Sequence, residues 1–174
     1  LPAELMGLNE KKFKQLNYLI NNKTFINNLI KNVEGILQCV KKGKTNSIIL
    51  NYDEDSQSLF YWYQQLVAES LGKKSKGILP IVSQMPKDNH SVMQLYLDGP
   101  KNNFFTFFDV YNQKSEKLDK LNLLQSHSYL KNKSINDIIF AQRLATEKIF
   151  KAKKIPFRSF FVKKKNEKTL GELF

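Results

Sequence analysis

Short apolar runs alternate with helical patterns along most of this 174-residue chain. We interpret the runs at 47–52, 78–82, 104–110 and 156–162 as buried strands, and Pro80 places the second run at a sheet edge or a strand end. Strands that alternate with helices predict a mostly parallel sheet covered by helices on both faces. We therefore expect an α/β fold, a three-layer α/β/α sandwich, in which functional residues lie at the carboxyl ends of strands.

Apolar residues at helical spacing mark the elements that cover the expected sheet. The expected helices lie at 8–20, 23–42, 53–71, 90–97, 135–153 and 169–174. Gly43 ends the second helix, and Thr169 is the expected N-cap of the last one. The segment 114–132 predicts a polar loop with a helical turn near 118–124. We expect a single domain, in which leading helices over 1–43 precede an α/β core over 44–174.

The two ends of the chain and its single cysteine indicate what kind of protein and which compartment the chain comes from. The chain begins Leu1-Pro2-Ala3 and stops at Phe174 inside a helical pattern, so we expect a piece of a longer protein. Cys39 cannot form an internal disulfide; it lies among apolar residues and is expected in the core, in a protein of a reducing, cytoplasmic compartment. No apolar run reaches the ~18 residues that a membrane-spanning helix needs, so no membrane association is expected.

The net charge of +12 comes from 28 basic and 16 acidic residues. Such a charge fits a nucleic-acid-binding protein, but Arg143 and Arg158 are the only arginines, and arginine is the residue expected at base-reading contacts. Abundant Lys, Asn and Ile also reflect A/T-rich codons. We therefore expect no nucleic-acid partner, although such a surface attracts an anionic sugar phosphate.

Several well-known sites have no match in the sequence. The chain lacks G-x-x-x-x-G-K-[ST], G-x-G-x-x-G and G-x-S-x-G, the patterns of nucleotide cradles and of the α/β-hydrolase nucleophile. His90 and His127 with one cysteine give no metal-binding cluster, so no metal is expected. Proton-transfer chemistry without a metal is left open.

The stretch at 64–73, QQLVAESLGK, closes one helical pattern with a carboxylate, a hydroxyl, a glycine and a lysine. Helical spacing puts Gln65 and Glu69 together beside the apolar stripe of that helix. We expect Glu69 at a partly buried edge, where desolvation would raise its pKa toward that of a general base. His90 follows the next expected strand and is the second candidate for proton transfer.

Both candidates lie in segments that resemble signatures of the phosphoglucose isomerase (glucose-6-phosphate isomerase) family. QQLVAESLGK resembles the family's QQ-x-x-x-ESNGK, and HSVMQLYLDG resembles its QH-x-x-x-QL-x-x-x-G at about the expected distance. Weaker likeness extends to residues 1–8 and 169–173. The chain as a whole resembles the second sugar-isomerase (SIS) domain of that family, without the first domain and the tail.

The resemblance implies a role for each matched residue. Glu69 matches the base that moves a proton between C1 and C2 of the open-chain sugar, and Gln65 matches a glutamine that contacts substrate. His90 matches the histidine that helps to open the sugar ring, acting across the interface of a homodimer. Ser70, Gly72 and Lys73 complete the motif and are expected to serve local structure. The resemblance implies no cofactor.

Two departures weaken the match around His90 more than around Glu69. Leu71 stands where the family has Asn, and the Lys87-Asp88-Asn89 loop stands where the family often has TNGQ. The family's phosphate-binding Ser/Thr loop and arginine belong to its first domain and its lysine to the tail, so none has a match here.

The leading hypothesis is the C-terminal SIS domain of an aldose–ketose isomerase. It would interconvert glucose 6-phosphate and fructose 6-phosphate through a cis-enediol, in glycolysis and gluconeogenesis, and would be inactive as an isolated piece. One alternative is a non-catalytic phosphosugar-binding module, which needs neither a base nor a ring opener. The other is a basic nucleic-acid-binding protein.

Overall fold

The computed structural model describes residues 2–9, 11–12, 16–111, 115, 117–118 and 124–173. Within them, β1 (Asn46–Asn51), β2 (Leu79–Gln84), β3 (Asn103–Val110) and β4 (Phe157–Val162) form one sheet in the order β2-β1-β3-β4. All three pairings are parallel, with Ile49 of β1 opposite Val82 and Thr106. β2 is an edge strand, as Pro80 predicted.

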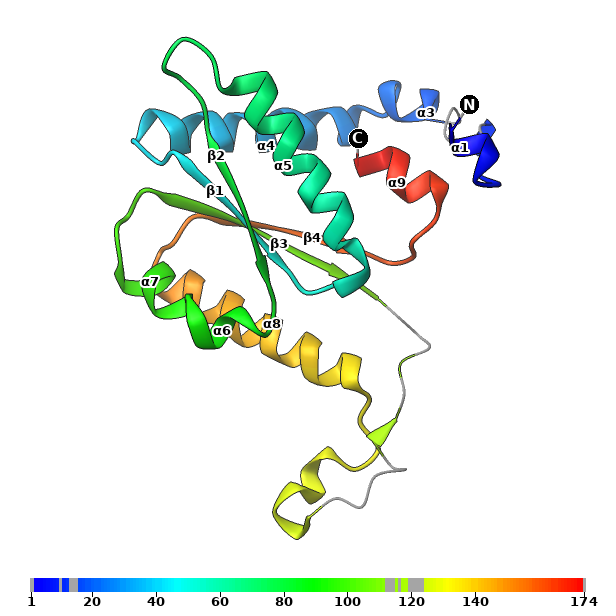
Figure 1. Ribbon diagram of the computed structural model, residues 1–174, viewed down its shortest axis with the longest axis vertical. Helices are drawn as coiled ribbons and strands as arrows, with labels where there is room; N and C mark the ends of the chain where they lie inside the picture. The colour runs from blue at the N-terminus through cyan, green and yellow to red at the C-terminus, as the bar shows by residue number, and fades with distance from the viewer. Residues whose placement is uncertain are drawn as a thin grey trace.

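Helices cover both faces of the sheet, which confirms the predicted three-layer α/β/α architecture (Figure 1). One face carries α4 (Lys23–Lys41), α5 (Gln57–Leu71) and α9 (Glu167–Leu173), and the other carries α6 (Asp88–Ser91), α7 (Met93–Asp98) and α8 (Ile135–Ala152). The remaining helical segments are α1 (Pro2–Leu5), α3 (Asn17–Ile20), η1 (Glu54–Ser56) and η3 (Gln125–Leu130).

The core is divided between the two faces by strand alternation. Ile48, Leu50, Phe105 and Phe107 pack with Phe150 of α8 on one face. The intervening residues of the same strands pack against α5 on the other face, in a cluster of Ile49, Phe60, Phe108, Val110 and Val162. Because both faces are covered, β3 is buried along its whole length, and five of its eight residues are apolar.

Side-chain caps set several helix boundaries. Asn22 Oδ1 accepts hydrogen bonds from the backbone N–H groups of Thr24 and Phe25 and begins α4. Ser134 and Asp137 form a reciprocal capping box at the start of α8. The predicted cap Thr169 is wrong: α9 begins earlier, because Asn166 Oδ1 accepts the Thr169 N–H at 2.9 Å.

Two other predictions need correction. The single helix expected at 90–97 is two short helices, α6 and α7, because the backbone departs from helical geometry at Val92 (φ −125°, ψ −8°). Cys39 is half-buried rather than in the core. Parts of the expected helix at 8–20 and of the turn at 118–124 lie outside the described residues.

The long leading helix α4 has an incompletely covered apolar face. None of its residues is buried, and Leu29, Val33 and Leu37 are each about half exposed. In the part of the chain that the structure describes, no helix has both the length and the apolarity to cross a bilayer.

Candidate active site

The last two turns of α5 bring together two predicted site residues. Gln65 Nε2 donates a hydrogen bond to Glu69 Oε1 at 3.0 Å, an i,i+4 contact on the helix surface. Both side chains are exposed, so the predicted partial burial of Glu69 is wrong. The neighbouring Gln64 turns toward the sheet instead, and its Nε2 donates to Pro80 O at 2.8 Å.

Gly72 ends α5 and has a steric reason to be glycine. Its N–H donates to Ala68 O at 2.9 Å, and a Cβ at this position would lie 2.5 Å from the same oxygen. A side chain would therefore push the backbone off the helix end just after Glu69. This contact agrees with the local structural role that the resemblance implies for Gly72.

A tight basic turn follows Gly72. Lys73 and Lys76 form an isolated antiparallel bridge, and both residues between them have positive φ, at 54° for Lys74 and 57° for Ser75. This geometry is that of a hairpin turn with two left-handed central residues. The lysines of the turn are exposed, so the Glu69 carboxylate lies near a positively charged loop that would attract an anionic substrate.

His90 lies in α6, just after the carboxyl end of β2, where the sequence placed it. Asp88 ties this short helix to the strand, since its Oδ2 accepts the Gln84 N–H at 2.9 Å and its Oδ1 accepts from Ser91 Oγ at 3.2 Å. His90 itself is exposed. The Lys87-Asp88-Asn89 departure from the family pattern therefore still forms an ordered helical turn.

Glu69 and His90 lie near opposite ends of β2, Glu69 beyond its amino end and His90 beyond its carboxyl end. Gln64 contacts Pro80 near the start of β2, and Glu69 lies further along α5 in the direction away from the strand, whereas His90 follows the strand's end. Figure 1 shows the C-terminal end of α5 near the start of β2 and helix α6 near the other end of the strand. A six-residue strand spans roughly 20 Å. One chain therefore does not bring both side chains to one small substrate.

The carboxyl edge also holds a cavity of about 950 Å³ that sequence reasoning missed. Its lining includes Tyr52, Asp53, Asp109, Asp137 and Lys163. Burial raises the pKa of Tyr52 to about 12, and its buried hydroxyl has no hydrogen-bond partner among the described residues. The available signal was the acidic run Asp53-Glu54-Asp55, which directly follows the 47–52 strand and begins the helix expected at 53–71.

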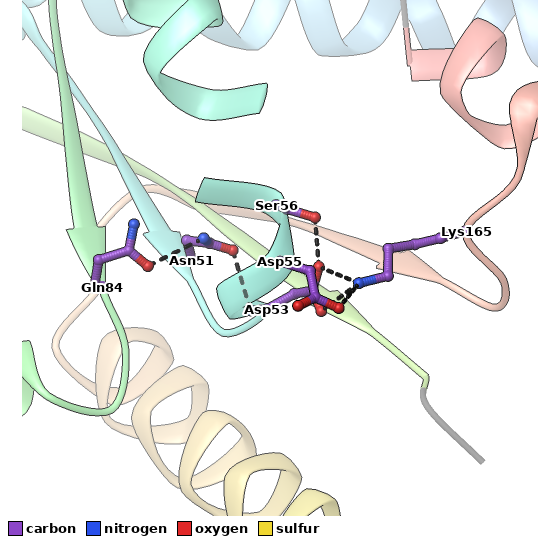
Figure 2. A network of polar contacts seen from close by, with 6 residues as sticks. All are labelled: Asn51, Asp53, Asp55, Ser56, Gln84 and Lys165. Carbon is purple, nitrogen blue, oxygen red and sulfur yellow. Dashed lines mark hydrogen bonds and ion pairs between the residues drawn. The ribbon is translucent and has the colours of Figure 1, made fainter. Parts of the chain in front are cut away.

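A polar network closes one side of this edge (Figure 2). Lys165, which precedes α9, contacts Asp53 at 3.1 Å and Asp55 at 2.6 Å, and Asp53 also accepts from Ser56 Oγ. Asn51 Oδ1 accepts the Asp53 N–H at 3.1 Å, and its Nδ2 donates to Gln84. The network links the segment after β4 to the start of α5 and leaves the carboxylates already paired.

Arg143 of α8 forms a second, buried network below the same edge. Its Nε donates to Asp109 Oδ2 at 3.0 Å, and its Nη1 donates to Glu147. Its guanidinium also lies 4.9 Å from the Phe140 ring centroid and 5.7 Å from that of Phe161. Burial raises the pKa of Asp109, and Arg143 opposes that rise. Every contact here joins α8 to β3 or β4 or runs within α8, which indicates a structural role.

No group of three or more His, Cys, Asp and Glu side chains suited to a metal occurs among the described residues.

Comparison with known proteins gives relatives for most of the chain. No family model matches it. It is 35% identical over 133 residues to a probable glucose-6-phosphate isomerase of Methanococcus maripaludis, a match that covers 76% of this chain and 30% of the relative. It is 33% identical over a 187-residue alignment to the glucose-6-phosphate isomerase of Mycoplasmopsis pulmonis, which covers 100% of this chain and 42% of the relative. The chain thus spans less than half of either relative.

A solved structure supports the fold. The crystal structure of a hypothetical protein from Thermus thermophilus superimposes with a TM-score of 0.71 at 22% identity, over 80% of this chain and 35% of that one. The likeness is to one α/β portion of a longer protein.

Proposed function

Because the chain is related in sequence to the glucose-6-phosphate isomerases, as its two motifs predicted, we propose that it is the C-terminal SIS domain of such an enzyme. The intact enzyme would interconvert glucose 6-phosphate and fructose 6-phosphate in the cytoplasm, in glycolysis and gluconeogenesis. The observation that carries the proposal is the Gln65–Glu69 pair at the end of α5, followed at once by the Gly72 helix end.

In the proposed reaction, Glu69 acts as the base on the open-chain sugar. Its carboxylate takes the proton from C2 while O1 gains a proton, which gives the cis-enediol. The Glu69 carboxyl group then returns a proton to C1 while O2 loses its own, which gives the ketose. Gln65 binds one oxygen of Glu69 and so orients the carboxylate. This proton transfer uses side chains alone and needs no cofactor.

We assign ring opening to His90 of a second subunit. A single chain holds Glu69 and His90 near opposite ends of β2, so one substrate can contact both only where two chains come together. In the proposed homodimer His90 of each subunit would lie near Glu69 of the other, and two-fold symmetry would then make the two sites equal. The basic turn after Gly72 favours approach of the anionic sugar phosphate.

Glu69→Gln in the intact enzyme tests the assignment of the base. The substitution keeps the size of the side chain and removes the carboxylate, so turnover should fall by about 10²-fold or more. Substrate binding should change little, because the phosphate would be held by other parts of the enzyme. The direct measurement is exchange of the substrate's C2 proton with solvent, which should fall together with turnover.

Glu34→Gln on the exposed surface of α4 is the matched control and should leave exchange unchanged. Exchange at the unmodified rate in the Glu69→Gln enzyme would mean that another residue is the base. Binding of glucose 6-phosphate without any C2 exchange in the unmodified enzyme would favour the sensor alternative. The isolated chain should have little or no activity, because positioning contributes much of such catalysis.

A further inference from the structure

The amino ends of β3 and β4 face α4 across a groove of about 500 Å³. Five cationic side chains line it, namely Lys31, Lys42, Lys44, Lys154 and Arg158. No Asp or Glu is among the described residues of the lining. The groove therefore concentrates positive charge without a carboxylate to balance it.

Arg158 is the most unusual member of this set. Its side chain is half-buried; its Nε donates to Thr106 Oγ1 at 3.0 Å, and its guanidinium lies 5.0 Å from the Phe160 ring centroid. No carboxylate pairs with it among the residues that the structure describes. A guanidinium has five N–H donors, so one neutral hydroxyl leaves most of its hydrogen-bonding capacity unused.

Burial of this cation has a cost that no carboxylate among the described residues offsets. Desolvation lowers the pKa of Arg158, although an arginine keeps its charge in proteins. The nearby Lys44 adds a second positive charge, and its Nζ donates to the backbone oxygen of Lys101 at 2.6 Å. A bound anion would supply both the missing charge and the missing acceptors.

We infer that this groove binds a small multivalent anion of the phosphate class. A planar guanidinium matches two phosphate oxygens, and the lysines around it suit the remaining charge. A volume of about 500 Å³ lies within the range of small-molecule sites. The inference does not rest on the proposed function.

The groove is separate from the proposed catalytic residues. His90 follows the carboxyl end of β2, whereas the groove and Glu69 both lie at the amino edge of the sheet; there α5 packs along β2 at one side, and Arg158 belongs to β4 at the other. Three strand spacings, roughly 14 Å, lie between these strands. A small ligand in the groove would therefore leave Glu69 accessible.

Titration calorimetry of the chain with inorganic pyrophosphate, at constant ionic strength, tests the site. Arg158→Met should raise the Kd about tenfold or more, the equivalent of one charge-assisted contact. Lys42→Met should weaken binding as well. Lys41→Met is the matched control, because Lys41 is on the same helix but outside the lining, and it should change the Kd less than twofold, a difference of about 0.4 kcal/mol.

Thermal unfolding provides a readout that does not depend on calorimetry. Saturating pyrophosphate should raise the Tm of the unmodified chain and of Lys41→Met, but not that of Arg158→Met. Glycerol phosphate in a parallel titration distinguishes a phosphorylated metabolite from an inorganic ion as the natural source, and binding of either supports the site.

Three results would overturn the inference. One is the absence of pyrophosphate and glycerol phosphate binding. Another is an equal loss of affinity in Lys41→Met and Lys42→Met, which would indicate net charge alone. The third is binding of a single-stranded oligonucleotide, but neither phosphate probe, with a loss in Arg158→Met, which would reassign the groove to nucleic acid.

Discussion

Arg143 and Arg158 are the only arginines in the chain; Arg143 is buried and Arg158 is half-buried, and they lie on opposite faces of the sheet. Each stacks against aromatic rings, Arg143 on Phe140 and Phe161 and Arg158 on Phe160. They differ in their polar partners. Arg143 contacts two carboxylates, whereas the described partner of Arg158 is the hydroxyl of Thr106.

The difference separates two uses of a buried cation. The Arg143 network is complete in the chain itself, and Ser159 Oγ donates to Glu147 at 2.7 Å to extend it to β4. The described surroundings of Arg158 hold no carboxylate, which is the observation behind the proposed anion site. The 26 other basic residues of the 28 are lysines, which carry compact, strongly hydrated charges that suit the surface. At both arginine positions the planar guanidinium lies over an aromatic ring.

Arg143→Met should have the largest effect on stability. Removal of the guanidinium leaves Asp109 and Glu147 without their cation, and Asp109 is only 7% exposed. The free energy of unfolding at neutral pH should fall by about 3 kcal/mol or more, the usual cost of removing one partner from a buried ion pair. Urea unfolding measures this directly.

Lys148→Met is the control for that experiment, because Lys148 is an exposed residue of the same helix. Its effect should stay within about 0.5 kcal/mol. An equally small effect of Arg143→Met would show that the network adds nothing to stability and would remove the contrast with Arg158.

The loss of unfolding free energy in Arg143→Met should depend on pH. Burial raises the pKa of Asp109 in the folded chain, and the variant loses the opposing effect of Arg143, so the folded-state pKa should rise further. The folded state then holds a proton that the unfolded state releases above about pH 3.9, so this contribution to stability falls as pH rises through the folded pKa.

The deficit of Arg143→Met relative to the unmodified chain should therefore be smaller near about pH 5 than at neutral pH. Adding Asp109→Asn, which places a neutral amide beside the vacated position, should recover part of the loss at neutral pH. Parallel deficits at both pH values would show that Asp109 is not the source of the destabilisation.

Arg158→Met should have the smallest effect on stability in the absence of anions. Replacing a half-buried cation that has no described carboxylate partner with an apolar side chain should change the free energy of unfolding by less than about 1 kcal/mol, or raise it. The same urea unfolding experiment, in a buffer without phosphate or sulfate, measures the change. A loss as large as that of Arg143→Met would show that Arg158 has a partner of equal strength.

Local patterns predicted the fold well. The four apolar runs became the four strands, because a strand buried on both faces needs little more than a short continuous apolar sequence between breaks. The i,i+4 spacing likewise predicted the contact between Gln65 and Glu69.

Contacts between residues far apart in the sequence could not be predicted from local patterns. The exposure of Glu69 depends on where α5 passes the start of β2. The carboxylate partners of Arg143 are Asp109, 34 positions away in sequence, and Glu147 of its own helix. The apolar stripe of α4 predicted packing but not its extent, because the pattern marks a face without stating what covers it.

The placement of Glu69 and His90 near opposite ends of β2 has a genetic consequence. If each site joins Glu69 of one subunit to His90 of the other, a mixed dimer of Glu69→Gln and His90→Ala chains contains one site with both substitutions and one with neither. Random exchange in an equal mixture makes about half of the dimers mixed, so two inactive enzymes should together recover about one quarter of normal activity. Two defective alleles in one cell would then complement each other.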